Sequence, residues 1–130
     1  MVFLHCRIAV DEFPGAFEQL VLMALIRLGE NAYGMTVRRE LAAGTGRDVS
    51  LGAVYSTLDR LERKGWVSSR SVAAGDSVER GGRARRFFRV EAAGEAAVQR
   101  ALAAMDRMRM PAPPDAVRRP RRPGIAGAGT

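Results

Sequence analysis

The sequence has few of the residues on which catalytic, metal-binding and cross-linked proteins depend. Its 130 residues include 1 cysteine and 1 histidine, which excludes an internal disulfide framework and a zinc site built on Cys and His. Glycine-rich phosphate loops and nucleophile motifs of the Gly-x-Ser-x-Gly type are absent as well. Acidic pairs such as Asp11-Glu12 lie outside the expected core. We therefore predict no enzyme activity, no cofactor and no metal site.

Long hydrophobic runs are also lacking. The best uninterrupted run, Leu20 to Ile26, has seven residues, whereas a membrane-spanning helix needs about 20. The apolar start of the chain is broken by His5, Cys6 and Arg7, and no small-residue cleavage site follows it, so it makes a poor secretory signal. Hydrophobic residues still make up 47% of the chain, enough for one small core. We expect a single-domain, soluble, cytoplasmic protein.

Positive charge is plentiful and unevenly placed. The chain has 21 basic and 14 acidic residues, a net charge of +7. Residues 79–89 (ERGGRARRFFR) and 109–130 each contribute +4, so the remainder sums to −1. Arginines interleaved with Phe87 and Phe88 in a strand-like stretch are typical of a ribbon that contacts nucleic acid. Residues 109–130, rich in proline and glycine, are expected to be a disordered basic tail, and residues 1–12 a flexible arm.

Periodicity predicts three helices, a hairpin and a last helix. Phe17 to Leu28 is apolar nearly all round, which indicates a helix buried on several faces, in a core or against a partner chain. Ser50 has the character of an N-cap for the third helix. In chain order, the other predicted elements are helices over 34–43 and 51–64, strands over 66–72 and 84–90 around a glycine-containing loop, and a helix over 92–108.

This order is that of a winged helix-turn-helix, mainly α with a β-hairpin, over residues 13–91. In that plan the third helix enters the major groove of DNA. Tyr55 fits the buried face of this helix or its edge, and we favour the core, with its hydroxyl a candidate phosphate contact. The side chains expected to face bases are Ser50, Ala53, Ser56 and Thr57. The side chains expected to hold phosphates or enter a minor groove are Arg60, Arg80, Arg83, Arg85 and Arg86.

Two other readings of the same residues stay open. A three-helix packet with a hairpin also serves as a protein-interaction module without specific DNA readout. Alternatively, the basic tail alone drives nonspecific binding to nucleic acid.

Three segments together resemble the PadR family of bacterial transcription regulators: YGMTVRREL, VSLGAVYSTLDRLERKGWVSSR and GGRARRFFRVEAAG. The matching hallmarks are Tyr33-Gly34, the Tyr-x-x-Leu-x-x-Leu-x-x-x-Gly pattern over 55–65, and a Gly-Arg-x-Arg wing leading to an aromatic pair over 82–88. The resemblance spans roughly residues 17–108. It implies a homodimeric repressor that binds a palindromic operator with its third helix and its wing, and that dimerises through the C-terminal helix, here 92–108.

The sequence departs from the family pattern in three places. Ala84 replaces a frequent proline of the wing, and Glu91 stands where a threonine often caps the last helix. The chain ends soon after one C-terminal helix, as in the short subclass of the family. Some short members bind hydrophobic drugs on interface aromatics, but residues 92–108 contain no aromatic, so we assign no small-molecule effector.

Overall fold

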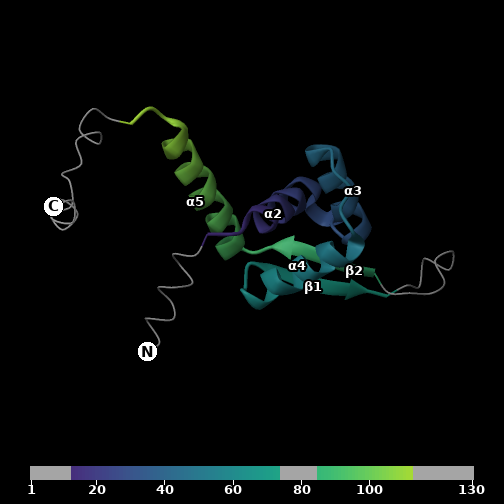
Figure 1. Cartoon of the computed structure of the whole chain (residues 1–130). Helices are drawn as coiled ribbons and strands as arrows, with labels where there is room; N and C mark the ends of the chain where they lie inside the picture. Colours follow the sequence, from purple (N-terminus) through teal and green to yellow (C-terminus); the bar gives the residue numbers. More distant parts are fainter. Residues whose placement is uncertain (1–12, 74–84, 113–130) are drawn as a thin grey trace, which may run out of the picture.

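A computed structural model describes residues 13–73 and 85–112 of the chain (Figure 1). In chain order the elements are α2 (Ala16–Leu28), η1 (Gly29–Asn31), α3 (Gly34–Thr45), α4 (Leu51–Arg63), β1 (Val67–Val72), β2 (Arg85–Val90) and α5 (Ala92–Arg109). The predicted class, mainly α with a β-hairpin, is therefore confirmed. Residues 1–12, the hairpin tip with Arg80 and Arg83, and residues 113–130 lie outside the described residues.

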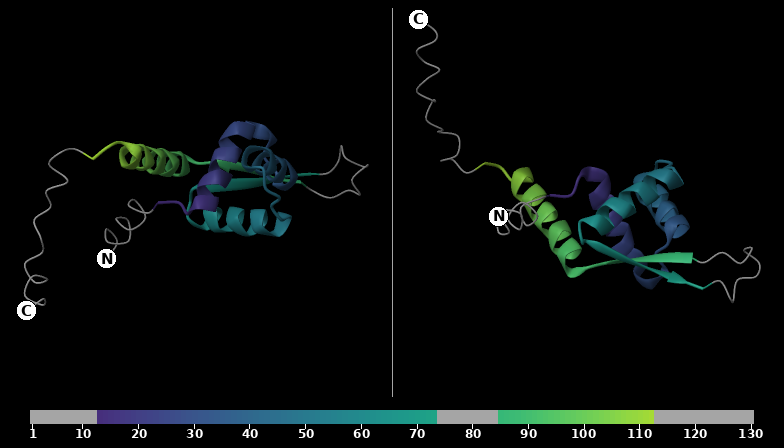
Figure 2. Two further views of the ribbon diagram at one scale, coloured as in Figure 1. Left: turned by 45° about the horizontal axis from the view of Figure 1, so that its top comes forward. Right: turned by 90° about the horizontal axis from the view of Figure 1, so that it is seen from below.

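The first three helices form one packet around a shared apolar core. Val21 and Leu22 of α2, Val37 of α3, and Leu58 of α4 are completely buried. Glycines stop two of these helices, because Gly29 and Gly46 adopt positive φ angles of 58° and 70° that other residues rarely take. Figure 2 shows the hairpin leaving this packet on one side and α5 leaving it on another.

The hairpin alternates its side chains between a buried and an outer face. The strands are antiparallel, with Val67 opposite Val90 and Ser69 opposite Phe88. Phe88 is 2% exposed and packs into the core, whereas Phe87 points to the other face. The Phe88 N–H also donates to the carbonyl oxygen of Ala32 at 2.8 Å, which ties β2 to the segment before α3. The hairpin base is thus fixed to the helical packet.

Two glycines allow close approaches that hold the elements together. A Cβ atom at Gly34 would lie 2.3 Å from Oη of Tyr55, so the Tyr55 ring rests directly on the start of α3. A Cβ atom at Gly94 would lie 2.3 Å from the backbone oxygen of Trp66, where the start of α5 lies against the segment between α4 and β1. The Tyr33-Gly34 pair therefore has a steric reason: only glycine admits Tyr55 at this position.

The last helix buries one end and exposes the other. Its first half packs on α2 and β2 through Ala97, Val98 and Ala101, each at most 4% exposed. Its second half extends away from the packet (Figure 1), and Met105 and Met108 are 54% and 84% exposed. No helix within residues 13–73 and 85–112 is long and apolar enough to cross a membrane.

Candidate nucleic-acid interface

The outer side of α4 carries small side chains at its N-terminal end. The Ser50 hydroxyl oxygen accepts the Ala53 N–H at 3.0 Å, which confirms Ser50 as the N-cap. Ala53 and Ser56 are exposed, and so is Gly52. The opposite side of the helix is completely buried through Val54, Leu58 and Leu61. Another molecule can therefore approach the backbone of α4 closely along this first turn and a half.

The structure corrects the assignment of Thr57 to this outer side. Thr57 is 2% exposed, so its side chain has no access to a base edge. The reason is helical geometry: Thr57 lies three residues after Val54 and four before Leu61, and both of these are buried. Its hydroxyl oxygen accepts a hydrogen bond from Nη2 of Arg60 at 3.4 Å. Thr57 is thus a polar member of the buried stripe.

Tyr55 lies at the edge of the core, not inside it. The residue is 36% exposed, and its ring is 6.4 Å from that of Phe88 between centroids. With the ring seated on Gly34, the exposed part of Tyr55 lies where α3 and α4 meet. Our preference for a core position is therefore wrong, and the phosphate contact of its hydroxyl stays a prediction.

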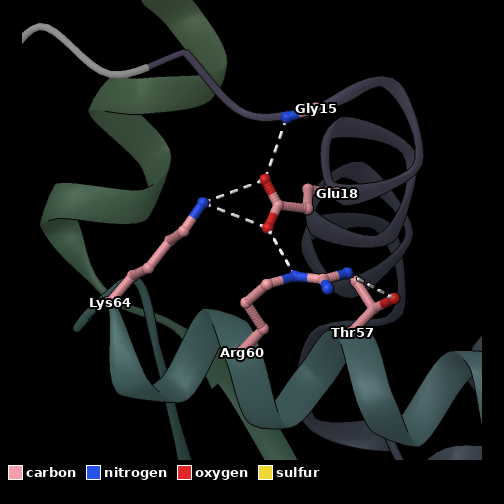
Figure 3. A network of polar contacts seen from close by, with 5 residues as sticks. All are labelled: Gly15, Glu18, Thr57, Arg60 and Lys64. Atoms are coloured by element: carbon pink, nitrogen blue, oxygen red, sulfur yellow. Dashed lines mark hydrogen bonds and ion pairs between the residues drawn. The ribbon is translucent and has the colours of Figure 1, made fainter.

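A carboxylate absent from the sequence prediction holds Arg60. Figure 3 shows Glu18 of α2 between Arg60 and Lys64. Its Oε2 accepts from Nε of Arg60 at 3.0 Å, and both carboxylate oxygens lie 3.1 Å from Nζ of Lys64. Its Oε1 also accepts the N–H of Gly15 at 2.9 Å. A single acidic side chain thus joins the start of α2 to the end of α4.

The environment of Glu18 favours its charged form. Burial alone would raise the pKa of this carboxyl group. The hydrogen bonds from Gly15, Lys64 and Arg60, together with the positive charge of Lys64, outweigh burial and hold the pKa below its ordinary value of 4.5. Lys64 also lies over the ring of Trp66, with Nζ 4.7 Å from the centroid.

The two arginines that begin β2, next to the hairpin loop, have protein partners on opposite faces. The Arg85 guanidinium lies 4.0 Å from the ring centroid of Tyr33, on the outer face. Arg86 faces α4 instead, where it forms ion pairs with Asp59 and Glu62. The carboxylate partners of Arg86 were not foreseen from the sequence, although both carboxylates stand one turn apart on α4.

The assembled surface is a helix N-terminus with small side chains, flanked by arginines and a tyrosine. Among residues 13–73 and 85–112, no group of three His, Cys, Asp or Glu side chains is placed to hold a metal ion. The pattern suits contact with an extended anionic surface and offers no arrangement of a nucleophile and a base.

Comparison with known proteins decides the family. The model of the PadR-like family of transcriptional regulators matches residues 21–100, which include the whole of α3, α4 and the hairpin. The chain belongs to this family. PadR-like proteins are transcription regulators, so the expected absence of enzyme activity is supported at the family level. None of the curated proteins matches the chain significantly.

Solved structures agree with the PadR-like fold. A PadR-like transcription factor from Bacteroides fragilis is 18% identical, with a TM-score of 0.61 over 74% of this chain and 85% of that one. A PadR family regulator from hypervirulent Clostridium difficile R20291 is also 18% identical, with a TM-score of 0.61 over 73% and 92% of the two chains. A complex of hsRosR-S1 is 28% identical, with a TM-score of 0.57 over 75% and 76%.

Proposed function

We propose that this PadR-like chain is a cytoplasmic, sequence-specific DNA-binding repressor that acts as a homodimer on a palindromic operator. The observation that carries the proposal is the small, exposed N-terminal face of α4. Because the side chains at Gly52, Ala53 and Ser56 are small, the backbone of α4 can lie deep in a major groove of about 12 Å width. The buried stripe behind this face keeps the helix rigid while it does so.

In this proposal, Ser50, Ala53 and Ser56 face the base edges. Ser50 uses a hydroxyl lone pair as the helix cap, and its O–H remains a donor toward DNA. Arg60 is half exposed; its Nε donates to Glu18 and its Nη2 to Thr57, and in this proposal its Nη1 donates to a phosphate. Arg85 and the Tyr55 hydroxyl are further phosphate contacts, as are Arg80 and Arg83 of the hairpin tip.

The dimer in this proposal forms through α5. The exposed methionines of its second half, Met105 and Met108, continue into Met110, which is 69% exposed. Flexible thioether side chains at helical spacing suit an adaptable helix–helix contact. Two heads related by a twofold axis would read two half-sites, which is why a palindrome is expected.

Selection from a random DNA pool, followed by two matched variants, tests the proposal. Ala53 and Ala93 are both exposed alanines in the first turn of a helix, where a carboxylate is compatible with the helix dipole. Ala53→Glu would place negative charge in the groove, and we expect it to weaken binding by about 1–3 kcal/mol, the cost of a lost base contact. Ala93→Glu, on α5, should bind like the unchanged chain.

Two results would contradict the proposal. The first is a pool from which no sequence is enriched at low salt, which would favour the protein-interaction module. The second is equal loss of affinity for Ala53→Glu and Ala93→Glu. Removing residues 111–130 tests the tail and leaves α5 and Met110 in place, because a specific repressor keeps its sequence preference without a basic tail.

A further inference from the structure

Arg86 lies at the centre of a polar network that joins three elements. Its Nη1 donates to Oδ1 of Asp59 at 3.2 Å, and its Nη2 donates to Oε1 of Glu62, both on α4. Its Nε donates to Oγ of Ser69 on β1 at 3.1 Å. Ser69 in turn donates its hydroxyl to Oε2 of Glu62 at 2.7 Å. The hydrogen bonds therefore form a closed ring through α4, β1 and β2.

This arrangement leaves Arg86 poorly suited to hold a phosphate. Each of its three guanidinium nitrogens already donates to a protein oxygen, and the guanidinium lies 4.8 Å from the ring centroid of Phe88. Two carboxylates face one guanidinium, so these three groups together carry a charge of −1. An approaching phosphate would meet Asp59, which is half exposed, before it could neutralise Arg86.

The neighbouring arginine shows the contrast. Strand alternation directs Arg85 to the outer face of the hairpin, opposite Val72, and directs Arg86 toward α4, opposite Ser71. Arg85 contacts the Tyr33 ring and has no carboxylate partner among the described residues. The two arginines are adjacent in sequence but lie in different surroundings, Arg85 against an aromatic ring and Arg86 against carboxylates.

We infer that Arg86 is a positioning residue, which fixes the angle between the hairpin and α4 through Asp59 and Glu62. The inference rests on the proposed function, because the angle matters where both the helix and the hairpin tip must meet one DNA duplex. A network of charges with a guanidinium that bridges two carboxylates holds geometry better than a single exposed pair. When the angle is already fixed, binding to DNA does not have to order the hairpin, and the associated loss of conformational entropy is avoided.

A mutant cycle with a charge exchange tests the inference on the selected DNA. Arg86→Ala and Glu62→Ala should each weaken binding about three- to tenfold, and the double variant should be no weaker than either, because both remove one interaction. Arg86→Glu combined with Glu62→Arg should restore part of the affinity that Arg86→Glu alone loses. Glu40→Gln, which removes the same charge from the exposed pair with Arg27, is the control and should not weaken binding.

A direct phosphate contact gives the opposite pattern. Glu62→Ala would then free Arg86 and strengthen binding, Arg86→Ala would lower the salt slope by about 1, and the charge exchange would rescue nothing. Any of these results overturns the inference. If the chain selects no DNA sequence, both the proposed function and the inference are wrong. If the chain binds DNA specifically but the losses of binding free energy of the two single variants add in the double variant, only the inference is wrong.

Discussion

Replacing Glu18 by glutamine should destabilise the fold, because it removes a single buried carboxylate that holds Arg60 and Lys64. The glutamine keeps the shape of the side chain, and its oxygen can still accept the N–H of Gly15. It loses the charge, however, and turns an amide NH2 group toward Lys64 or Arg60, which are donors themselves. The variant therefore isolates the charged part of the interaction.

The size of the effect follows from the exposure of the partners. The Glu18 side chain is 9% exposed and Lys64 is 23% exposed, so this pair is largely shielded, and a hydrogen bond to a charged group is worth about 1.5–3 kcal/mol. Arg60 is 50% exposed, so its share is below about 1 kcal/mol. We expect a loss of about 2 kcal/mol for Glu18→Gln, which lowers Tm by roughly 10 °C in a domain of this size.

Urea unfolding followed by the fluorescence of the single tryptophan measures this loss. Trp66 is 4% exposed and lies under Lys64, so its emission reports on this region directly. Because the folded-state pKa of Glu18 is below 4.5, its contribution is present at neutral pH. It is lost as the pH falls from about 4.5 through the folded-state pKa, so wild type and variant should converge in acid.

The control is Glu40→Gln, which breaks the surface pair between Glu40 and Arg27. Arg27 is 74% exposed, so the expected cost is about 0.2–1 kcal/mol. If Glu18→Gln costs no more than Glu40→Gln at pH 7, or if its cost does not shrink in acid, the reasoning from burial and charge is wrong.

Three further predictions follow from the packing. Gly94→Ala should cost about 1–3 kcal/mol in urea unfolding because its Cβ would meet backbone, whereas Gly44→Ala, with nothing within 4 Å, should be neutral or stabilising. Ser50→Ala should cost about 1 kcal/mol of stability through loss of the cap, and equal unfolding of the variant and wild type would refute the capping role. The double variant Met105→Ser, Met108→Ser should shift the mass measured by light scattering toward that of the monomer. Its Tm should equal that of the unchanged chain when both are diluted until they are monomeric. An unchanged mass would place the dimer contact elsewhere.

The sequence predicted the helices and strands well because their signals are local. Apolar spacing, the cap at Ser50 and the glycines at 29 and 46 each act within one turn. Small differences appeared at helix ends: the second helix was expected over 34–43, yet α3 continues to Thr45. Such boundaries depend on neighbouring elements as much as on the residue itself.

The site was harder to predict because it depends on contacts between distant segments. Glu18 and Arg60 are 42 residues apart in sequence, and nothing local marks them as partners. Glu18 is the only acidic residue in the sequence of α2, which was a signal that could have been weighed. Thr57 was misplaced for a simpler reason: its position in the Val54–Leu61 stripe outweighs its polar character. Counting arginines likewise could not tell Arg86, which faces carboxylates, from Arg85.

The contact between Lys64, Glu18 and Trp66 has a consequence for chemical labelling. Lys64 is the only lysine of the chain, so a reagent that acylates side-chain amines has one target. The Lys64 side chain is 23% exposed, and its Nζ is held by both carboxylate oxygens of Glu18, so a reagent must compete with this contact. The rate of acylation therefore reports how often the Lys64 amine leaves the Glu18 carboxylate, and the tryptophan beside the amine gives an optical signal of the modification.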